Sequence, residues 1–215
     1  MRSLPPTDGP SASRRRFLEL AGGTGAISIL LAACGEKEET IPAGDGRDTA
    51  PGPGEGDAAI LNFALTLEYL EADFYRRAVD SGELRDRRVA EVVKAIGADE
   101  REHVGALKAA LAGVGARPVT APRTRFDEIL GGGQGRILET AATVENLGAA
   151  AYLGQAGRIQ DAGLLATALS IHSNEGRHAA ALNRLVGGPI VPDGAFAKPA
   201  TMDEVRAGLR PFIVA

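Results

Sequence analysis

The chain has 215 residues, of which 44% are hydrophobic and 24% charged, and its formal net charge is −4 at pH 7. This length suffices for one sizeable domain with appendages, and the dispersed Lys and Arg residues form no basic face, so no nucleic-acid partner is expected. Aromatic residues make up only 4% and Trp is absent, which favours helical packing over a β-sandwich. The single cysteine, Cys34, excludes an internal disulfide and a thiolate-rich metal site. Any metal must therefore be bound by Glu, Asp or His.

Residues 1–34 have the pattern of an export signal. Residues 13–19 contain three consecutive arginines, and a short apolar run interrupted by glycines follows over 20–33. A basic start, a short apolar region and small residues before Cys34 are typical of a secretory signal, and the run is too short and too rich in glycine for a stable membrane span. The alternative is an ordinary cleaved signal with an incidental cysteine.

The signal also carries two more specific patterns. The pair Arg14-Arg15, followed by Phe-Leu at 17–18, resembles a twin-arginine signal, although Lys is more usual where Glu19 stands. Residues 31–34, Leu-Ala-Ala-Cys, resemble a bacterial lipobox, which implies a lipid on Cys34. The resemblance implies export of the folded chain by the twin-arginine machinery, with any metal loaded in the cytoplasm. The mature protein is then expected in the periplasm or anchored by lipid to the outer face of the cytoplasmic membrane.

Residues 35–57 are rich in Glu, Gly, Pro, Asp and Thr. They cannot bury enough apolar surface to order themselves and are expected to form a disordered tether. The folded domain is expected over 58–187, followed by a C-terminal tail over 188–215.

Apolar residues with the helical period of 3.6 predict four helices in the domain. We expect them over about 57–79, 86–113, 134–155 and 161–185, with Asp57 and Asp161 as N-caps and a short helix over 202–209 in the tail. Residues 116–133 contain two prolines and three consecutive glycines and predict no regular element. Two short hairpins around this long connection predict an all-α, antiparallel four-helix bundle with one crossover between the second and third helices.

A Glu and a His three residues apart occur twice, as Glu100/His103 and Glu175/His178. Three residues along a helix return to nearly the same face, one turn on, so both side chains can bind one ion. A single such pair is weak, because the spacing is common by chance. Its repetition makes the signal strong.

The helices before these pairs repeat as well. Residues 66–75 and 143–152 share Thr, Glu, Leu, Ala and Tyr in register, so Glu68 matches Glu145 and the bundle consists of two similar hairpins. Glu71 lies on the same side of its helix as Glu68 but matches Gly148. We therefore expect Glu68 to be the ligand and Glu71 to be an accessory or solvent-facing carboxylate.

The complete set resembles the ferritin-like di-iron carboxylate superfamily, in which two helices each give one Glu and two helices each give a Glu-x-x-His pair. The protein is expected to be exported and to form no storage cage, and in these features it is similar to the ferritin-like group that includes desiccation-related proteins. The chain differs from rubrerythrin in lacking a cysteine site for iron, and from storage ferritins in its doubled pair. The resemblance implies six metal ligands: Glu68, Glu100, His103, Glu145, Glu175 and His178.

The charge of this set also points to metal. Two divalent ions would neutralise four carboxylates, whereas converging carboxylates without metal would repel one another and some would bind protons. Oxygen-rich ligation with one imidazole per ion favours two Fe ions, or Mn or a mixed Fe/Mn pair, with Zn as an alternative.

Other polar residues of the helices have several interpretations. Tyr75 and Tyr152 lean back toward the ligand layer, as hydrogen-bond donors to a carboxylate, as one-electron relays or as ordinary core tyrosines. His172 is expected to be a partly exposed polar residue or a partner of a ligand. Solvated charges are expected at Asp99, Glu102 and Glu139.

Two functions fit the sequence. One is an exported di-metal oxidoreductase or ferroxidase acting on Fe(II), O₂ or peroxide, and the other is a non-catalytic metal-binding or stress-protective bundle at the cell surface. A metal-free interaction module would leave the six-residue set unexplained. The expected partners are metal ions, O₂ or peroxide, the export machinery and the membrane through Cys34, with a homodimer left open.

Overall fold

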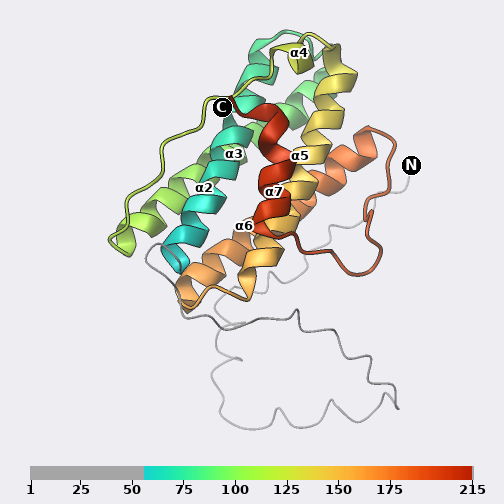
Figure 1. Cartoon of the computed structure of the whole chain (residues 1–215). Helices are drawn as coiled ribbons and strands as arrows, with labels where there is room; N and C mark the ends of the chain where they lie inside the picture. The colour runs from blue at the N-terminus through green and yellow to red at the C-terminus, as the bar shows by residue number, and fades with distance from the viewer. Residues whose placement is uncertain (1–55, 215) are drawn as a thin grey trace, which may run out of the picture. The chain divides into compact units, whose positions relative to one another are not determined.

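The computed structural model describes residues 56–214, so the expected signal and nearly all of the expected tether lie outside the described residues. Within 56–214 the chain is helical and has no strand, which confirms the all-α prediction (Figure 1). The helices are α2 (Asp57–Asp80), α3 (Arg87–Gly113), α4 (Asp127–Leu130), α5 (Gly133–Ala156), α6 (Ala162–Leu185) and α7 (Met202–Leu209), followed by the 3₁₀ turn η1 (Arg210–Phe212). None of these helices is long and apolar enough to cross a membrane.

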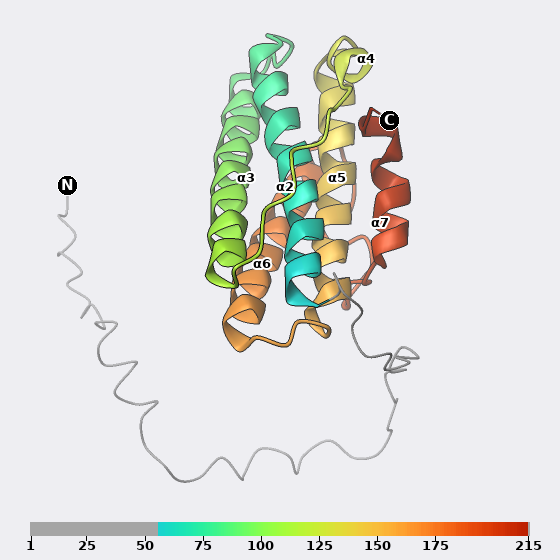
Figure 2. The same cartoon turned by 60° about the vertical axis from the view of Figure 1, so that its left-hand side comes forward.

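Two antiparallel hairpins, α2 with α3 and α5 with α6, make up the bundle. The segment between α3 and α5 runs back along the length of the bundle, so α5 runs parallel to α3 (Figure 2). This confirms the single long crossover. The prediction of no regular element in 116–133 was wrong in part, because α4 lies there and Thr124 forms an isolated bridge with Ile213. The helix α7 lies against α5 on the outside of the bundle.

Side-chain caps explain where two of the four long helices, α3 and α6, begin. The Asp86 carboxylate accepts from the backbone N–H groups of Arg88 and Val89, and Asp161 accepts from Leu164, as expected for N-caps. The expected N-cap of α2 was wrong: Gly56 occupies that position, and Asp57 lies in the first turn. Its carboxylate instead accepts from the backbone N–H groups of Gln160 and Asp161, and so ties the start of α2 to the loop between α5 and α6.

The apolar core is divided into two clusters. One gathers residues from the second half of α2 and the first half of α3, such as Phe74 and Val93, and the other gathers Leu61 and Leu107 from the opposite halves. Fully buried glutamates occupy the middle of all four long helices, between these clusters. The bundle therefore holds a polar layer at its centre.

Candidate metal centre

Six buried side chains from four helices meet in this central layer. The residues are Glu68 on α2, Glu100 and His103 on α3, Glu145 on α5, and Glu175 and His178 on α6. The four glutamates have no exposed surface, and the two histidines are only 8% and 6% exposed. These are the six residues that the sequence repeat singled out.

The six residues form two overlapping groups whose potential ligand atoms lie within 4.8 Å of one another. The His103 group consists of Glu68, Glu100, His103 and Glu175, and the His178 group consists of Glu100, Glu145, Glu175 and His178. Glu100 and Glu175 belong to both groups. Two ions could therefore share these two carboxylates, while each ion would also have its own histidine and its own glutamate.

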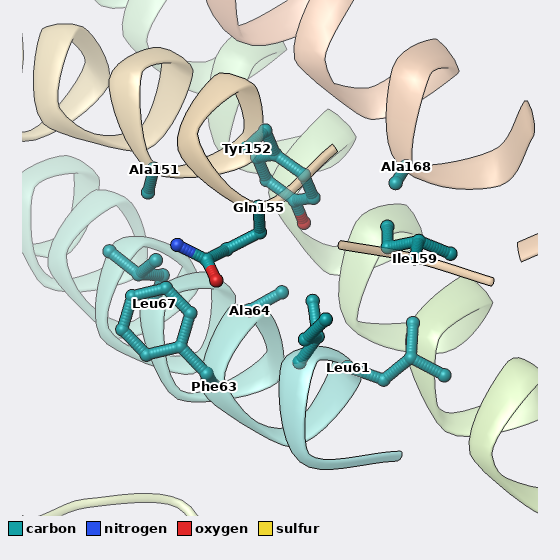
Figure 3. A pocket seen from close by; sticks show the side chains of 10 residues that line it. Leu61, Phe63, Ala64, Leu67, Ala151, Tyr152, Gln155, Ile159 and Ala168 are labelled. Carbon is teal, nitrogen blue, oxygen red and sulfur yellow. The ribbon is translucent and has the colours of Figure 1, made fainter. Parts of the chain in front are cut away.

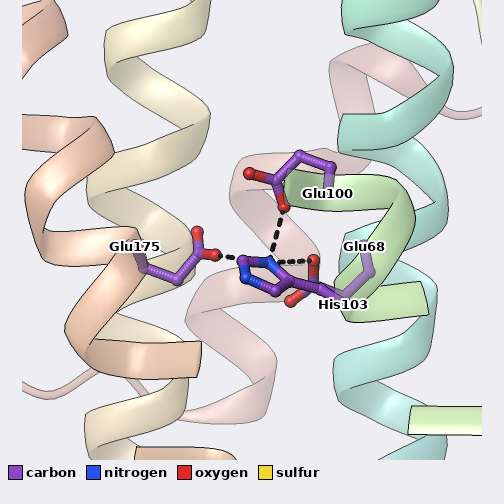
Figure 4. A group of neighbouring side chains, drawn as sticks. All are labelled: Glu68, Glu100, His103 and Glu175. Carbon is purple, nitrogen blue, oxygen red and sulfur yellow. Dashed lines mark hydrogen bonds and ion pairs between the residues drawn. The ribbon is translucent and has the colours of Figure 1, made fainter. Parts of the chain in front are cut away.

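Both histidines turn Nδ1 toward the carboxylates. His103 Nδ1 lies 3.0 Å from Glu100 Oε2 and 3.2 Å from Glu175 Oε1 (Figure 4). His178 Nδ1 lies 2.9 Å from Glu100 Oε1 and 3.2 Å from Glu145 Oε2. Nδ1 is the inner nitrogen of each ring, because it faces the carboxylates, and it is therefore the nitrogen positioned to bind a metal ion.

Burial and mutual repulsion make this cluster costly without metal. Burial raises the pKa of Glu68 to about 8, despite hydrogen bonding to His103. Burial, followed by the charge of neighbouring glutamates, also raises the pKa of Glu175 well above its ordinary value. Glu100 is the exception: burial opposes its ionisation, but hydrogen bonds with His103 and His178 lower its pKa to about 2. Burial lowers the pKa of each imidazole, yet the surrounding carboxylates outweigh it and raise the pKa of His103 to about 12 and that of His178 to about 11.

Protein groups leave much of the cluster's hydrogen-bonding capacity unused. Four buried oxygens have an imidazole nitrogen at 2.9–3.3 Å as their contact, namely Glu68 Oε2, Glu100 Oε1, Glu145 Oε2 and Glu175 Oε1. Both oxygens of Glu71 and Glu175 Oε2 are buried and have no hydrogen-bond partner among residues 56–214. Buried polar atoms are seldom left in this state in a folded protein. Carboxylate oxygens and imidazole nitrogens are ligands for Fe and Mn, so the residues present fit a pair of such ions.

Glu71 is a fifth buried carboxylate of this layer. It has no exposed surface, so the solvent-facing alternative was wrong. Its side chain occupies space that Gly148 leaves open: a Cβ at Gly148 would lie 3.1 Å from Glu71 Oε1 and 2.9 Å from Glu175 Oε2. The pairing of Glu71 with Gly148 in the repeat therefore has a steric reason.

The two tyrosines of the repeat each bond to the opposite hairpin. The Tyr75 hydroxyl donates to Glu145 Oε1 and the Tyr152 hydroxyl donates to Glu68 Oε1, both at 2.5 Å. Of the interpretations that the sequence left open, hydrogen-bond donation to a carboxylate is the one that the structure shows. The sequence repeat could not show which glutamate each tyrosine would meet, because that depends on how the hairpins pack.

The outer nitrogens of the histidines face two residues that the sequence reasoning did not place at the site. Asp99 Oδ2 lies 3.1 Å from His178 Nε2, so Asp99 is more than a solvated charge although its side chain is half-exposed. Asn174 Nδ2 lies 3.2 Å from His178 Nε2 and 3.4 Å from His103 Nε2. Each residue directly precedes the Glu of a Glu-x-x-His pair, so extending the repeat by one position would have found both.

A small apolar cavity borders the layer on the side of Tyr152 (Figure 3). Its volume is about 10 Å³, which is at the lower limit for a single water-sized molecule. The lining is almost entirely apolar and comes from α2, α5, α6 and the loop before α6, including Leu61, Ala64 and Ala168. Tyr152 connects this cavity to the metal centre, because its hydroxyl contacts Glu68.

The remaining polar candidates lie away from the centre. Glu102 and Glu139 are exposed, as expected. His172 is part-buried, and its Nδ1 lies 3.0 Å from the backbone oxygen of Ala149. It contributes to neither of the two groups.

A helical bundle with paired Glu and His groups at its centre is the architecture of ferritin-like metal-binding proteins. The chain belongs to the ferritin-like domain family, whose model matches residues 56–188. A solved structure, that of hypothetical protein MJ0754 from Methanococcus jannaschii DSM 2661, is similar with a TM-score of 0.50 and 15% identity, over 75% of this chain and 97% of that chain. At this identity the likeness shows the fold alone. The comparison with curated proteins finds no match.

Proposed function

We propose that the protein binds two iron ions between its four long helices and oxidises Fe(II) with O₂ or peroxide. The observation that carries this proposal is the pair of overlapping groups, each with one histidine and three glutamates, which lie buried at the centre of the bundle. Mn or a mixed Fe/Mn pair would fit the same ligands.

The chemistry that bound iron would supply is one-electron transfer: each Fe(II) gives up one electron, and peroxide takes up two electrons and two protons to yield two waters. The chain's own residues hold the reactants. Glu68 and Glu145 are each fixed by a tyrosine hydroxyl from the opposite hairpin. Such donors orient a ligand and keep its position when the charge at the centre changes.

The apolar lining of the small cavity beside Tyr152 favours O₂ over peroxide as the molecule near the ligand layer, and its volume is at the lower limit for one water-sized molecule. A dry apolar cavity accommodates a small neutral molecule better than a strongly hydrogen-bonding one. This cavity ends at Tyr152, next to Glu68, so a molecule in it would lie close to the ligand layer.

Stopped-flow mixing of Fe(II)-loaded protein with O₂ or peroxide tests the proposal. We expect rapid Fe(III) formation that repeats with further Fe(II), and its loss in the Glu175→Ala variant, which removes a carboxylate common to both groups. Glu102→Ala, on the exposed side of α3, is the control. Bound metal without oxidation in the wild-type protein would contradict turnover and favour the non-catalytic, stress-protective function.

We also propose that the protein is exported and lipid-anchored. The support is the twin-arginine pair Arg14-Arg15 and the lipobox ending at Cys34, residues that lie outside the described part of the chain. Replacing both arginines with Lys should leave the precursor in the cytoplasm, and Cys34→Ser should release the exported protein from the membrane fraction. Normal export of the first variant would contradict the twin-arginine assignment.

A further inference from the structure

The two metal-binding groups are built from a repeat, but their surroundings differ. Asp99 and Asn174 occupy equivalent positions, one residue before Glu100 and Glu175 respectively. Asp99 Oδ2 lies 3.1 Å from His178 Nε2, so this imidazole has a carboxylate as the acceptor for its outer N–H. A carboxylate in this position fixes the ring and makes its inner nitrogen a stronger metal ligand.

Among residues 56–214, His103 Nε2 has no carboxylate contact. Its polar contact is the amide nitrogen of Asn174, at 3.4 Å, and the same amide nitrogen lies 3.2 Å from His178 Nε2, so Asn174 contacts both histidines. The same amide nitrogen lies 3.3 Å from Asp99 Oδ2 and donates to it. Asn174 cannot also present its oxygen to His103 without giving up the bond to Asp99. The contact at His103 Nε2 is therefore a hydrogen-bond donor. Turning the Asn174 amide would offer Nε2 a neutral oxygen, which is a weaker acceptor than a carboxylate.

The position of Glu71 adds a second asymmetry on the same side. Glu71 extends from α2 to the bare backbone of Gly148, which lies one turn after Glu145 on α5. Glu71 therefore adds a buried carboxylate beside α5, the helix that carries Glu145, and Glu145 belongs to the His178 group alone. The equivalent place beside Glu68 has no such carboxylate, because Gly148 is the residue that matches Glu71.

We propose that the two metal positions are unequal: the His178 group holds a tightly bound, resident ion, and the His103 group holds a weaker, exchangeable ion. Asp99 is the positioning residue that sets this difference. The inference rests on the proposed metal-binding function and deepens it, because the exchangeable position is then the one through which Fe(II) enters as substrate.

Titration of the full-length, metal-free protein with Co(II), followed calorimetrically and by visible absorption, tests the inference. The wild-type protein should bind in two steps. The repeat offers a matched pair of variants: His103→Ala should keep the tight step, whereas His178→Ala should keep only the weak one. Binding in one step, or a tight step that survives in His178→Ala and disappears in His103→Ala, would overturn the inference.

Exchanging Asp99 and Asn174, the residues at the outer nitrogens of the histidines, gives a second test that leaves all six ligands in place. Asp99→Asn should weaken the tight step by roughly 10- to 100-fold. Asn174→Asp places a carboxylate within reach of the outer nitrogens of both histidines, so it should strengthen the weak step and narrow the difference between the two steps. Both positions are accessible to solvent, so the variants should fold, and unfolding of the metal-free variants by urea checks this.

The outcomes separate this inference from the proposed function. Two ions bound with equal affinity, unchanged by either exchange, would overturn the inference and leave the metal centre standing. A wild-type protein that binds no Co(II) would overturn both.

Discussion

Tyr75 and Tyr152 each join the two hairpins at the level of the metal centre. Because each hydroxyl donates to a glutamate of the other hairpin, removing it leaves a buried carboxylate oxygen without its partner. We expect Tyr75→Phe and Tyr152→Phe to destabilise the metal-free protein by about 1–3 kcal/mol each, and the metal-loaded protein by less. Urea unfolding with and without metal measures both effects.

Tyr69 offers the matched control for these variants. It is on α2 and is only partly buried, and no hydrogen bond of its hydroxyl is found within residues 56–214. Tyr69→Phe should change stability by less than about 0.5 kcal/mol. An equal loss in all three variants would show that the tyrosine–glutamate bonds add nothing specific.

The candidate metal centre requires a residue without a side chain at position 148. A Cβ there would press on Glu175 Oε2 at 2.9 Å and on Glu71 Oε1 at 3.1 Å, so Gly148→Ala should displace carboxylates and lower metal affinity at least about tenfold. Gly176→Ala is the control, because a Cβ at Gly176 meets no heavy atom within 4 Å. This variant should bind metal normally and gain about 0.5–1 kcal/mol in stability. Unchanged metal affinity in Gly148→Ala would contradict this role of the glycine.

The convergence of the six candidate ligands could be predicted from the sequence because helical spacing and an internal repeat both constrain it. The repeat matched Glu68 with Glu145 and left Glu71 without a counterpart, and the structure places Glu68 and Glu145 in opposite groups. The burial of Glu71 and the role of Asp99 were not readable in this way. Both depend on contacts between helices, which spacing along one helix does not contain.

At the scale of the elements, periodicity and caps located the helices well. The expected range 202–209 coincides with α7, and Asp161 is the N-cap of α6. The prediction of Asp57 as an N-cap was wrong because an acidic residue before an apolar run is the usual sign of an N-cap. The sequence looks the same when the carboxylate bonds to a neighbouring loop instead of its own helix. The short helix α4 was missed because a single turn has too few residues to show a period.

Asp57 has a testable role in holding the hairpins together. Asp57→Ala removes the acceptors for the backbone N–H groups of Gln160 and Asp161, so we expect a loss of about 1–2 kcal/mol in stability. Asp80→Ala, at the other end of α2, removes only an exposed ion pair with Arg76 and should cost less than about 0.5 kcal/mol. Equal unfolding midpoints for the two variants would contradict the role of Asp57.

At the scale of the whole molecule, the buried centre makes the stability of the metal-free protein depend on pH. The folded pKa values of Glu68, His103 and His178 are raised to about 8, about 12 and about 11. The folded protein therefore retains protons that the unfolded chain releases, above the unfolded pKa of 4.5 for Glu68 and 6.5 for the histidines. Stability must fall as the pH rises through this window. Glu100, with its pKa lowered to about 2, acts in the opposite direction only below about pH 4.5.

Urea unfolding of the metal-free protein between about pH 5.5 and about pH 8.5 should show this decline. The metal-loaded protein should decline less, because metal ions replace the protons on the ligands. A metal-free protein whose stability stays constant or rises over this range would contradict the buried, proton-sharing cluster.

The metal content of the purified protein tests the central claim most directly. Elemental analysis of protein folded in the cytoplasm should find roughly two Fe or Mn ions per chain, as expected for a ferritin-like pair. His103→Ala and Glu145→Ala should each reduce this content, whereas Glu139→Ala, at an exposed position on α5, should not. Protein without metal, or unchanged metal content in both ligand variants, would contradict a metal centre at the middle of the bundle.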